Sequence, residues 1–240
     1  MGAEYNEVQW MTLLAEATEE IKKLQRSFAL WQFEDSIGAS KLLPQWIEAQ
    51  HKRNPIQEVF DIGCGVGLLS VFVRLLSPTA EIRQMDRDPL ETSYPVRQKF
   101  RLTYFVSDVC ESAMHIADSI PDTLDTIIMA DMIQFLEYSP LQVFELCRHA
   151  LKPGGFLYIS CPDSASTYGK VYKYVTGWQE LKSAAPETYR GGIAPAKPEV
   201  VWNYSKADVI EIATQAGLKL ARMGYSSTAR GLHLNFAFTK

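Results

Sequence analysis

The stretch Val59-Phe60-Asp61-Ile62-Gly63-Cys64-Gly65-Val66-Gly67 decides the fold class of this chain. A short apolar run leads into three glycines at alternate positions, and a second apolar run, 68–76, follows at once. This pattern predicts a buried strand, a glycine-rich turn and a helix in direct succession. Glycines let a backbone approach a ligand closely, and free N–H groups at a helix start favour a carboxylate or phosphate. Taken alone, the turn fits any nucleotide-like ligand, and it also fits a purely structural tight turn.

Short apolar runs alternate with longer helical stretches on the C-terminal side of this loop. The expected strands cover 59–62, 81–85, 102–106, 126–130 and 156–160, and two more cover 218–225 and 232–239. Such alternation predicts βαβ units and a mostly parallel sheet. The turn Lys152-Pro153-Gly154-Gly155 is expected to separate a helix from the fifth strand.

The flanking segments predict three units. Apolar residues recur at helical spacing over 4–30, a second helix is expected over 39–51, and residues 1–54 therefore form an N-terminal helical cap. Residues 162–203 lack a regular pattern and are rich in Tyr, Trp, Pro and Gly, which indicates an insertion. Ser205 is the expected N-cap of a last helix that Gly217 ends. The core then comprises 55–161 and 204–240. The first helix could pack on this core, cover a site as a lid, or form a homodimer contact.

Composition excludes several classes of protein. The 240 residues suit one large domain with an appendage, and 47% hydrophobic with 22% charged residues is ordinary globular usage. The net charge of −4 comes without a block of Lys and Arg, which argues against a dedicated nucleic-acid binder. Four scattered cysteines without a C-x-x-C pair argue against a zinc site and a disulfide framework, so no metal is expected. The sequence shows no signal peptide and no apolar run that could span a bilayer, so a cytoplasmic protein is expected.

Acidic residues stand beside three of the expected strand ends. Asp61 lies two positions before Gly63, Asp86 ends the second strand, and Asp108 follows the third. A carboxylate after the second strand can accept hydrogen bonds from both ribose hydroxyls, as it does for NAD in dinucleotide-binding folds. The dinucleotide fingerprint is G-x-G-x-x-G, whereas the glycines here form G-x-G-x-G and position 68 is Leu.

With these acids, the loop resembles motif I of the class I S-adenosylmethionine-dependent methyltransferases. The segments 124–136 and 151–157 are similar to that family's fourth strand and late motif. The resemblance covers about 57–161 together with the C-terminal helix and two strands. It implies an α/β fold with a doubly wound, seven-stranded, mostly parallel sheet and an antiparallel last strand. An N-terminal helical cap and a lid insertion after the fifth strand complete the expected architecture.

The resemblance also implies the cofactor, S-adenosylmethionine, with S-adenosylhomocysteine as product. In the family, the residue matching Asp61 helps to hold the donor's amino group, and the acid matching Asp108 binds the adenine amino group beside a backbone amide. The implied cofactor-binding residues are Asp61, Gly63, Cys64, Gly65, Gly67, Leu68, Asp86, Arg87, Asp108, Val109, Asp131 and Met132.

The acceptor side is less defined. Many relatives carry His where this chain has Phe135, so the catalytic base, if one is used, is unknown. Asp163 follows the fifth strand, His233 starts the last one, and the aromatic residues of 162–203 either stack on a flat substrate or simply pack on the core. The candidate substrate residues are Trp31, Phe135, Asp163, Tyr168, Tyr172, Trp202 and His233.

Three functions remain open from the sequence. The favoured one is methyl transfer to an O, N or C nucleophile, and the negative charge and aromatic insertion favour a small molecule over a protein or RNA. The second is a protein of the same fold that binds the cofactor without transferring methyl, such as a non-redox cyclase or a partner subunit. The third, a nicotinamide-dependent oxidoreductase, is disfavoured by the glycine spacing.

Overall fold

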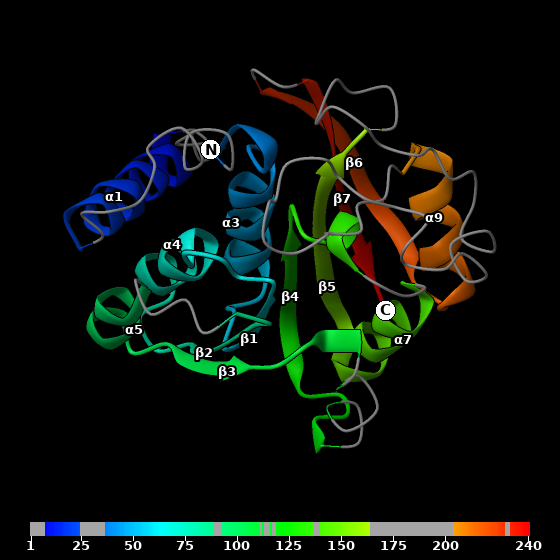
Figure 1. The fold of residues 1–240 in the computed structure, drawn as a ribbon, viewed down its shortest axis with the longest axis horizontal. Coiled ribbons are helices and arrows are strands. Elements are labelled where there is room, and N and C mark those ends of the chain that lie inside the picture. Colours follow the sequence, from blue (N-terminus) through cyan, green and yellow to red (C-terminus); the bar gives the residue numbers. More distant parts are fainter. Residues whose placement is uncertain are drawn as a thin grey trace, which may run out of the picture.

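Seven strands form one sheet in the order β3-β2-β1-β4-β5-β7-β6 (Figure 1). The computed structural model describes residues 8–24, 37–88, 93–110, 112, 116, 119–136, 140–163, 204–228 and 231–240. Strands β1 to β5 pair in parallel, and β7 runs antiparallel to both β5 and β6. The predicted sheet with an antiparallel last strand is thereby confirmed. The strands are β1 (Glu58–Ile62), β2 (Glu81–Asp86), β3 (Thr103–Val106), β4 (Leu124–Ala130), β5 (Leu151–Pro162), β6 (Lys219–Thr228) and β7 (Gly231–Thr239).

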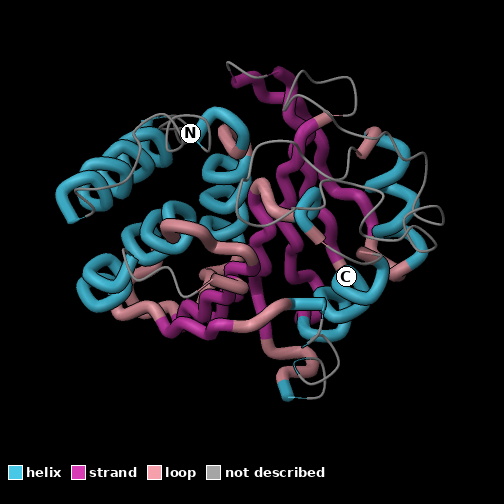
Figure 2. Tube along the Cα trace, viewed as in Figure 1, coloured by secondary structure: helices cyan, strands magenta, loops and turns pink. Residues whose placement is uncertain are grey.

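Helices cover both faces of this sheet, which Figure 2 shows as a central band of strands between two helical groups. One face carries α1 (Val8–Leu24), α3 (Leu43–Arg53), α4 (Leu68–Leu76) and α5 (Tyr94–Phe100). The other face carries α7 (Leu141–Ala150) and α9 (Lys206–Gln215), and the short 3-10 helix η2 (Ile133–Phe135) follows β4. The doubly wound arrangement is therefore the observed one.

Strand β4 shows why the sheet is buried on both sides. Ile127 and Met129 face the core under α7 and α9, whereas Ile128 and Ala130 face the core under α1, α3 and α4. Side chains alternate across a strand, so a central strand with helices on both faces must be apolar at every position. Four of the five residues in the run 126–130 meet this requirement, and the exception is Thr126, whose hydroxyl donates to Gln50 Oε1 at 3.0 Å.

Local signals set the element ends in most places. Ser205 caps α9 in a reciprocal capping box with Asp208, and Gly217 follows the helix with φ +81°, as predicted. The expected boundary of β5 was wrong. The turn residues 152–155 do not precede the strand but lie inside it, because Leu151 already pairs with Leu124 and the ladder then shifts register before Thr126 pairs with Phe156. The glycines thus form an irregularity in an early-starting strand.

The N-terminal helices pack on the sheet's α4 face. Helix α1 contacts α3 and α4, and its described residues lie within the predicted range 4–30. Helix α3 begins at Leu43, later than the predicted residue 39, with Pro44 in its first turn, where the missing N–H costs nothing. The aromatic insertion predicted over 162–203 lies outside the described residues except for its first two positions.

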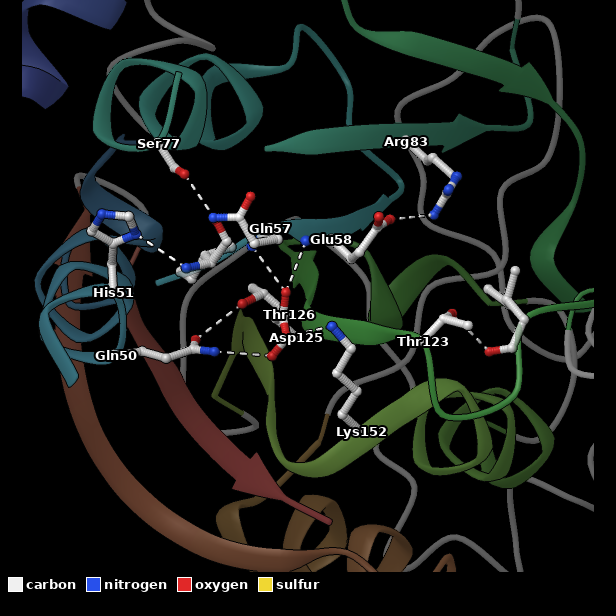
Figure 3. A network of polar contacts seen from close by, with 12 residues as sticks. Gln50, His51, Gln57, Glu58, Ser77, Arg83, Thr123, Asp125, Thr126 and Lys152 are labelled. Carbon is white, nitrogen blue, oxygen red and sulfur yellow. Dashed lines mark hydrogen bonds and ion pairs between the residues drawn. The ribbon is translucent and has the colours of Figure 1, made fainter. Parts of the chain in front are cut away.

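A polar network ties α3 to the edge of the sheet where the parallel strands begin (Figure 3). The Asp125 carboxylate accepts from the N–H groups of Gln57 and Glu58 and from Lys152 Nζ, each at 2.9 Å. Gln50 of α3 donates to the Asp125 carbonyl, again at 2.9 Å. These hydrogen bonds hold this edge of the sheet together. A ligand can instead bind at the opposite edge, where β1 to β4 end. No helix among the described residues is long and apolar enough to cross a bilayer.

Candidate functional site

A cavity of about 310 Å³ opens where β1, β2, β3 and β4 end. This is the edge at which open α/β sheets bind ligands. Backbone and side chains from four strand ends converge there although they are far apart in sequence. The lining residues are Ile62, Gly63, Gly65, Met85, Asp86, Arg87, Asp88, Ser107, Asp108, Val109, Asp131, Met132, Phe135 and Leu136.

The glycine loop forms one wall of the cavity, and its three glycines serve different purposes. Gly63 has φ +67°, and a Cβ there would lie 2.6 Å from Met132 Cβ, so this glycine permits close packing. Gly67 has φ +81°, and a Cβ there would lie 2.6 Å from Gln84 Nε2. Gly65 has φ +51°, yet a Cβ there would meet nothing within 4 Å. The space in front of Gly65 is therefore open on the cavity side of the loop.

Asp86, at the end of β2, is bonded to the loop. Its Oδ2 accepts the N–H of Gly65 at 3.1 Å, and its Oδ1 accepts the N–H of Asp88 at 3.3 Å. Since each carboxylate oxygen has more than one lone pair, these two bonds orient the group and leave it able to accept further hydrogen bonds from a ligand.

Asp108, after β3, is held in the same way. Its Oδ1 accepts the N–H of Cys110 at 2.7 Å, and its carbonyl accepts the N–H of Ser112 at 3.0 Å. The neighbouring Val109 is 5% exposed and borders the cavity. A carboxylate and an apolar surface side by side suit a flat heterocycle with an exocyclic amino group.

Asp61 lies behind the loop and not on the cavity wall. It is 3% exposed, and Ser70 Oγ donates to its Oδ2 at 2.6 Å. Burial raises the pKa of this carboxyl to about 7, against the hydrogen bond from Ser70, which lowers it, and Asp86 adds a smaller upward contribution. A buried carboxyl with this pKa takes up or loses its charge near neutrality, and a cationic neighbour would favour the charged form.

The segment after β4 borders the cavity next to the glycine loop. Asp131 has φ +54°, a conformation that residues other than glycine adopt only where the surroundings hold it. Its N–H donates to Ser160 O at 2.9 Å and lies 3.0 Å from Ser160 Oγ. Gln134 Nε2 donates to the carbonyl of Asp131 at 2.9 Å and to its Oδ1 at 2.8 Å. Met132, Phe135 and Leu136 make the rest of its lining apolar.

His233 and Asp163 lie beside the cavity without lining it. His233 is 1% exposed on β7, and its Nε2 lies 3.6 Å from Asp131 Oδ1. Asp163 forms an isolated parallel bridge with Tyr204, and its N–H donates to Leu232 O at 3.0 Å. His233 therefore lies behind Asp131, out of reach of solvent.

The structure brings together most of the predicted site residues that it describes. Of the predicted cofactor residues, Asp61, Cys64, Gly67 and Leu68 lie in or behind the loop, and the others line the cavity, as does Phe135. Trp31, Tyr168, Tyr172 and Trp202 lie outside the described residues. Sequence reasoning missed five lining residues: Ile62, Met85, Asp88, Ser107 and Leu136. Each of them is the sequence neighbour of a predicted residue near the end of a strand. They could have been found by including every residue next to a predicted strand end.

This arrangement fits S-adenosylmethionine. The donor has a ribose, an adenine and an amino acid part, and the cavity offers an oriented carboxylate at Asp86, a second at Asp108, and open space at Gly65. The loop's N–H groups suit a carboxylate. Among the described residues, no group of three or more His, Cys, Asp or Glu is placed to hold a metal ion.

Comparisons with known proteins agree with this fit. Residues 60–159 match the family described as "Methyltransferase domain". The ubiquinone biosynthesis O-methyltransferase of Vibrio cholerae is 28% identical over 185 residues, which cover 70% of this chain and 69% of the relative.

Solved structures show the same fold. The Burkholderia thailandensis 1,6-didemethyltoxoflavin-N1-methyltransferase, with bound 1,6-didemethyltoxoflavin and S-adenosylhomocysteine, superposes with a TM-score of 0.59 at 11% identity over 100% of this chain and 93% of its own. The N-methyltransferase NodS of Bradyrhizobium japonicum, in complex with S-adenosylhomocysteine, gives 0.55 at 16% identity over 93% and 98%.

The strand order, the glycine loop with its acids and the matched domain lead to one conclusion. The chain is an S-adenosylmethionine-dependent methyltransferase of the class I, Rossmann-like type.

Proposed function

We propose that this enzyme methylates an oxygen atom on a small, flat molecule. The observation that carries the proposal is the make-up of the cavity lining. The ends of β2 and β3 supply the carboxylates Asp86, Asp88 and Asp108, which we call the polar half. The segment after β4 supplies the apolar side chains of Met132, Phe135 and Leu136 with one carboxylate, Asp131, and we call it the apolar half. The polar half suits the donor, and the apolar half suits a flat acceptor that bears a hydroxyl group.

The donor would lie along the loop. Asp86 would accept hydrogen bonds from the ribose hydroxyls, Asp108 from the adenine amino group, and the Val109 N–H would meet a ring nitrogen. Asp61 would balance the charge of the donor's amino group from behind Gly63, Cys64 and Gly65. Gly67 and Leu68 would present the first turn of α4, Arg87 would border the adenosine, and Asp131 and Met132 would border the methyl end.

The bound donor supplies a methyl group already activated on a positively charged sulfur. The protein's residues would then mainly hold two reactants in line, an effect worth about 7–11 kcal/mol in well-oriented reactions. The apolar wall of Met132, Phe135 and Leu136 would keep water away from the methyl group.

Two observations favour oxygen as the accepting atom over nitrogen or carbon. The similar curated proteins are O-methyltransferases, and a carboxylate, Asp131, borders the apolar half, where a hydroxyl could use a proton acceptor. A nitrogen acceptor is the second candidate, because the structural neighbours include N-methyltransferases. The N-terminal cap, 1–54, and the insertion, 162–203, would select the acceptor and include its candidate residues Trp31, Tyr168, Tyr172 and Trp202. Asp163 would border the same half.

A two-part experiment tests this function. Calorimetric titration with S-adenosylhomocysteine, S-adenosylmethionine and NADH should show micromolar binding of the first two and none of the third. Transfer of labelled methyl is then measured to hydroxyl acceptors (catechol, 3,4-dihydroxybenzoate and 4-nitrocatechol) and to the amines aniline and benzylamine. Transfer to the amines alone would replace oxygen by nitrogen as the acceptor.

Two further proposals concern the whole molecule. The exposed side of α1, where Met11 is 58% exposed, would form a homodimer contact. Light scattering after gel filtration of wild type and Met11→Lys tests this, and a wild-type monomer contradicts it.

The enzyme would act in the cytoplasm without nucleic acid or membrane as partner, and an unchanged Kd for S-adenosylhomocysteine on adding RNA or lipid vesicles is the expected result.

A further inference from the structure

We infer that Asp131 accepts the proton of the acceptor hydroxyl, and that His233, buried behind it, is the residue that positions its carboxylate. The inference rests on the proposed O-methyl transfer. It names a base for this chain, which has Phe135 where many relatives carry a histidine. It also separates Asp131 from the donor-binding residues, since it assigns this carboxylate to the acceptor.

The backbone of Asp131 is held in an unfavourable conformation. Its φ of +54° costs on the order of 1 kcal/mol or more for a residue with a Cβ. Hydrogen bonds from its N–H to Ser160 and from Gln134 to its carbonyl keep it there. In this conformation Asp131, directly after the end of β4, lines the cavity.

The two oxygens of this carboxylate have different surroundings. Oδ1 accepts from Gln134 Nε2 at 2.8 Å and lies 3.6 Å from His233 Nε2. No donor in the described part of the chain is bonded to Oδ2, while the side chain remains 23% exposed and borders the cavity. One oxygen is thus anchored and the other is available, which is the arrangement of a base held by an orienting partner.

His233 reaches this position only through the antiparallel last strand. It pairs with Pro162 of β5 and Ser226 of β6, and it is 1% exposed. Its Nε2 lies 3.6 Å from Oδ1, which is longer than a hydrogen bond, and the inference requires this distance to shorten when the acceptor binds.

Buried polar groups near Asp131 and His233 lower the stability of the fold. Gln134 Oε1 and Asn235 Oδ1 are buried and have no hydrogen-bond partner among the residues that the structure describes. Each such acceptor costs about 1–3 kcal/mol. Among the described residues, Cys161 at the end of β5 and Asp163 directly after it are ionisable neighbours of the pair. The Cys161 thiol has its pKa raised mainly by burial and further by the charges of Asp131 and Asp163.

The proton transfer balances as follows. The acceptor's O–H bond breaks, its proton goes to Asp131 Oδ2, and its electron pair stays on oxygen. An oxygen lone pair forms the bond to the methyl carbon, and the electrons of the carbon–sulfur bond go to sulfur, which becomes a neutral thioether. His233 keeps Oδ1 oriented throughout, and Asp131 returns its proton to solvent once the product leaves.

The variants Asp131→Asn, His233→Gln and His233→Leu test the inference. Asn accepts left-handed backbone and keeps the shape of Asp131, so kcat with catechol should fall about 100-fold or more. His233→Gln, which can still donate to Oδ1, should retain more activity than His233→Leu, which cannot. The Kd for S-adenosylhomocysteine should change less than about threefold in Asp131→Asn and His233→Gln.

Asp122→Asn is the matched control. Asp122 also has a left-handed backbone, φ +51°, but it lies at the opposite edge of the sheet beside Lys240. The same substitution there should leave kcat unchanged. Thermal unfolding of all variants separates loss of folding from loss of catalysis.

Two readouts respond to a base but not to a structural residue. With 4-nitrocatechol, whose acidic hydroxyl is already largely ionised at pH 8, Asp131→Asn should lose far less activity than with catechol. In ¹⁵N-detected NMR of the histidine side chains, the His233 signal of wild type should show a proton on Nε2 and should change in Asp131→Asn.

The possible failures are distinct. Wild type that does not bind S-adenosylhomocysteine contradicts the proposed function, and wild type that methylates only amines contradicts its choice of oxygen. Wild type that methylates catechol while Asp131→Asn keeps its kcat overturns the inference. A parallel loss of S-adenosylhomocysteine affinity and activity in Asp131→Asn would make Asp131 a donor ligand, which also overturns it. An Nε2 without a proton in the NMR spectrum overturns the role of His233.

Discussion

Asp86 Oδ2 accepts a hydrogen bond from the backbone N–H of Gly65 at 3.1 Å. This contact joins the end of β2 to the glycine loop, so the acid proposed for the ribose and the loop proposed for the amino acid part are positioned together. A change in either residue should therefore alter the position of both groups and weaken the binding of the donor.

Asp86→Ala should weaken the binding of S-adenosylhomocysteine by about 1.5–3 kcal/mol, because the ribose hydroxyls and the Gly65 N–H lose a charged acceptor. Calorimetric titration measures the change. Glu81→Ala, at the other end of the same strand and exposed, is the control and should bind as wild type. Equal affinities of Asp86→Ala and wild type would remove Asp86 from the donor site.

Gly65→Ala and Gly154→Ala form a matched pair. Both glycines have positive φ, +51° and +80°, and a Cβ at either meets nothing within 4 Å. Each variant should lose about 1–2 kcal/mol of unfolding free energy from backbone strain. Only Gly65→Ala should also lose S-adenosylhomocysteine binding, since only Gly65 borders the cavity. A methyl group tolerated at 65 without loss of affinity would mean that the donor does not lie against the loop.

Donor binding should depend on pH through Asp61. Burial raises the pKa of this carboxyl to about 7, so below that pH it is neutral in the ligand-free protein and cannot balance the charged amino group of the donor. The affinity for S-adenosylhomocysteine should fall by up to about tenfold per pH unit below 7. Titrations between pH 5.5 and 8.5 measure this, and Asp61→Asn should bind weakly with a flat profile. A flat profile in wild type would contradict the role of Asp61.

The same group should make the ligand-free protein less stable at high pH. The folded-state pKa of Asp61, about 7, lies above the ordinary value of 3.8. The contribution of this carboxyl to the free energy of unfolding is therefore most favourable below pH 3.8, and it is lost as pH rises through 7. Asp61→Asn removes the buried charge and keeps an acceptor for Ser70, so it should raise the unfolding free energy at pH 8 by about 2–4 kcal/mol. Urea unfolding at pH 5 and pH 8 checks this, and a destabilised Asp61→Asn at pH 8 would contradict it.

Asp125 should have the opposite dependence on pH. Burial alone would raise its pKa, but hydrogen bonds from Lys152, Gln57 and Glu58 outweigh burial and hold the pKa below its usual value. Its contribution to stability is therefore present above the unfolded pKa of about 3.8 and is lost as pH falls through the folded value. Asp125→Ala should lower the free energy of unfolding by about 2 kcal/mol at pH 7 and by less at pH 3. Exposed Glu145→Ala is the control, and a loss at pH 3 equal to that at pH 7 would contradict the prediction.

The donor half of the site could be predicted from the sequence because its signals are local. Asp61, Gly63 and Gly65 lie within five residues, and Asp86 and Asp108 each end or follow an apolar run that is recognisable as a strand. Parallel strands bring their ends to one edge of the sheet, so the order of these runs along the chain already implied that their acids meet.

The start of β5 shows the limit of local signals. Lys152-Pro153-Gly154-Gly155 is a strong turn sequence, yet Leu151 pairs with Leu124 before the turn, and the strand includes it. Pairing with β4 and the salt bridge from Lys152 to Asp125 decide this boundary. Neither partner is close in sequence, so the turn signal alone misplaced the strand.

The sequence by itself indicated the fold class through its hydrophobic periodicity, and its glycines and acids indicated the methyl donor through their resemblance to a known family. All of these signals are properties of short segments. Only the tertiary structure decided the contact on which the proposed acceptor side rests. Asp131 and His233 are brought within 3.6 Å by the antiparallel insertion of β7 between β5 and β6. That contact depends on register between distant strands, where a shift of one residue would turn His233 to the other face of the sheet.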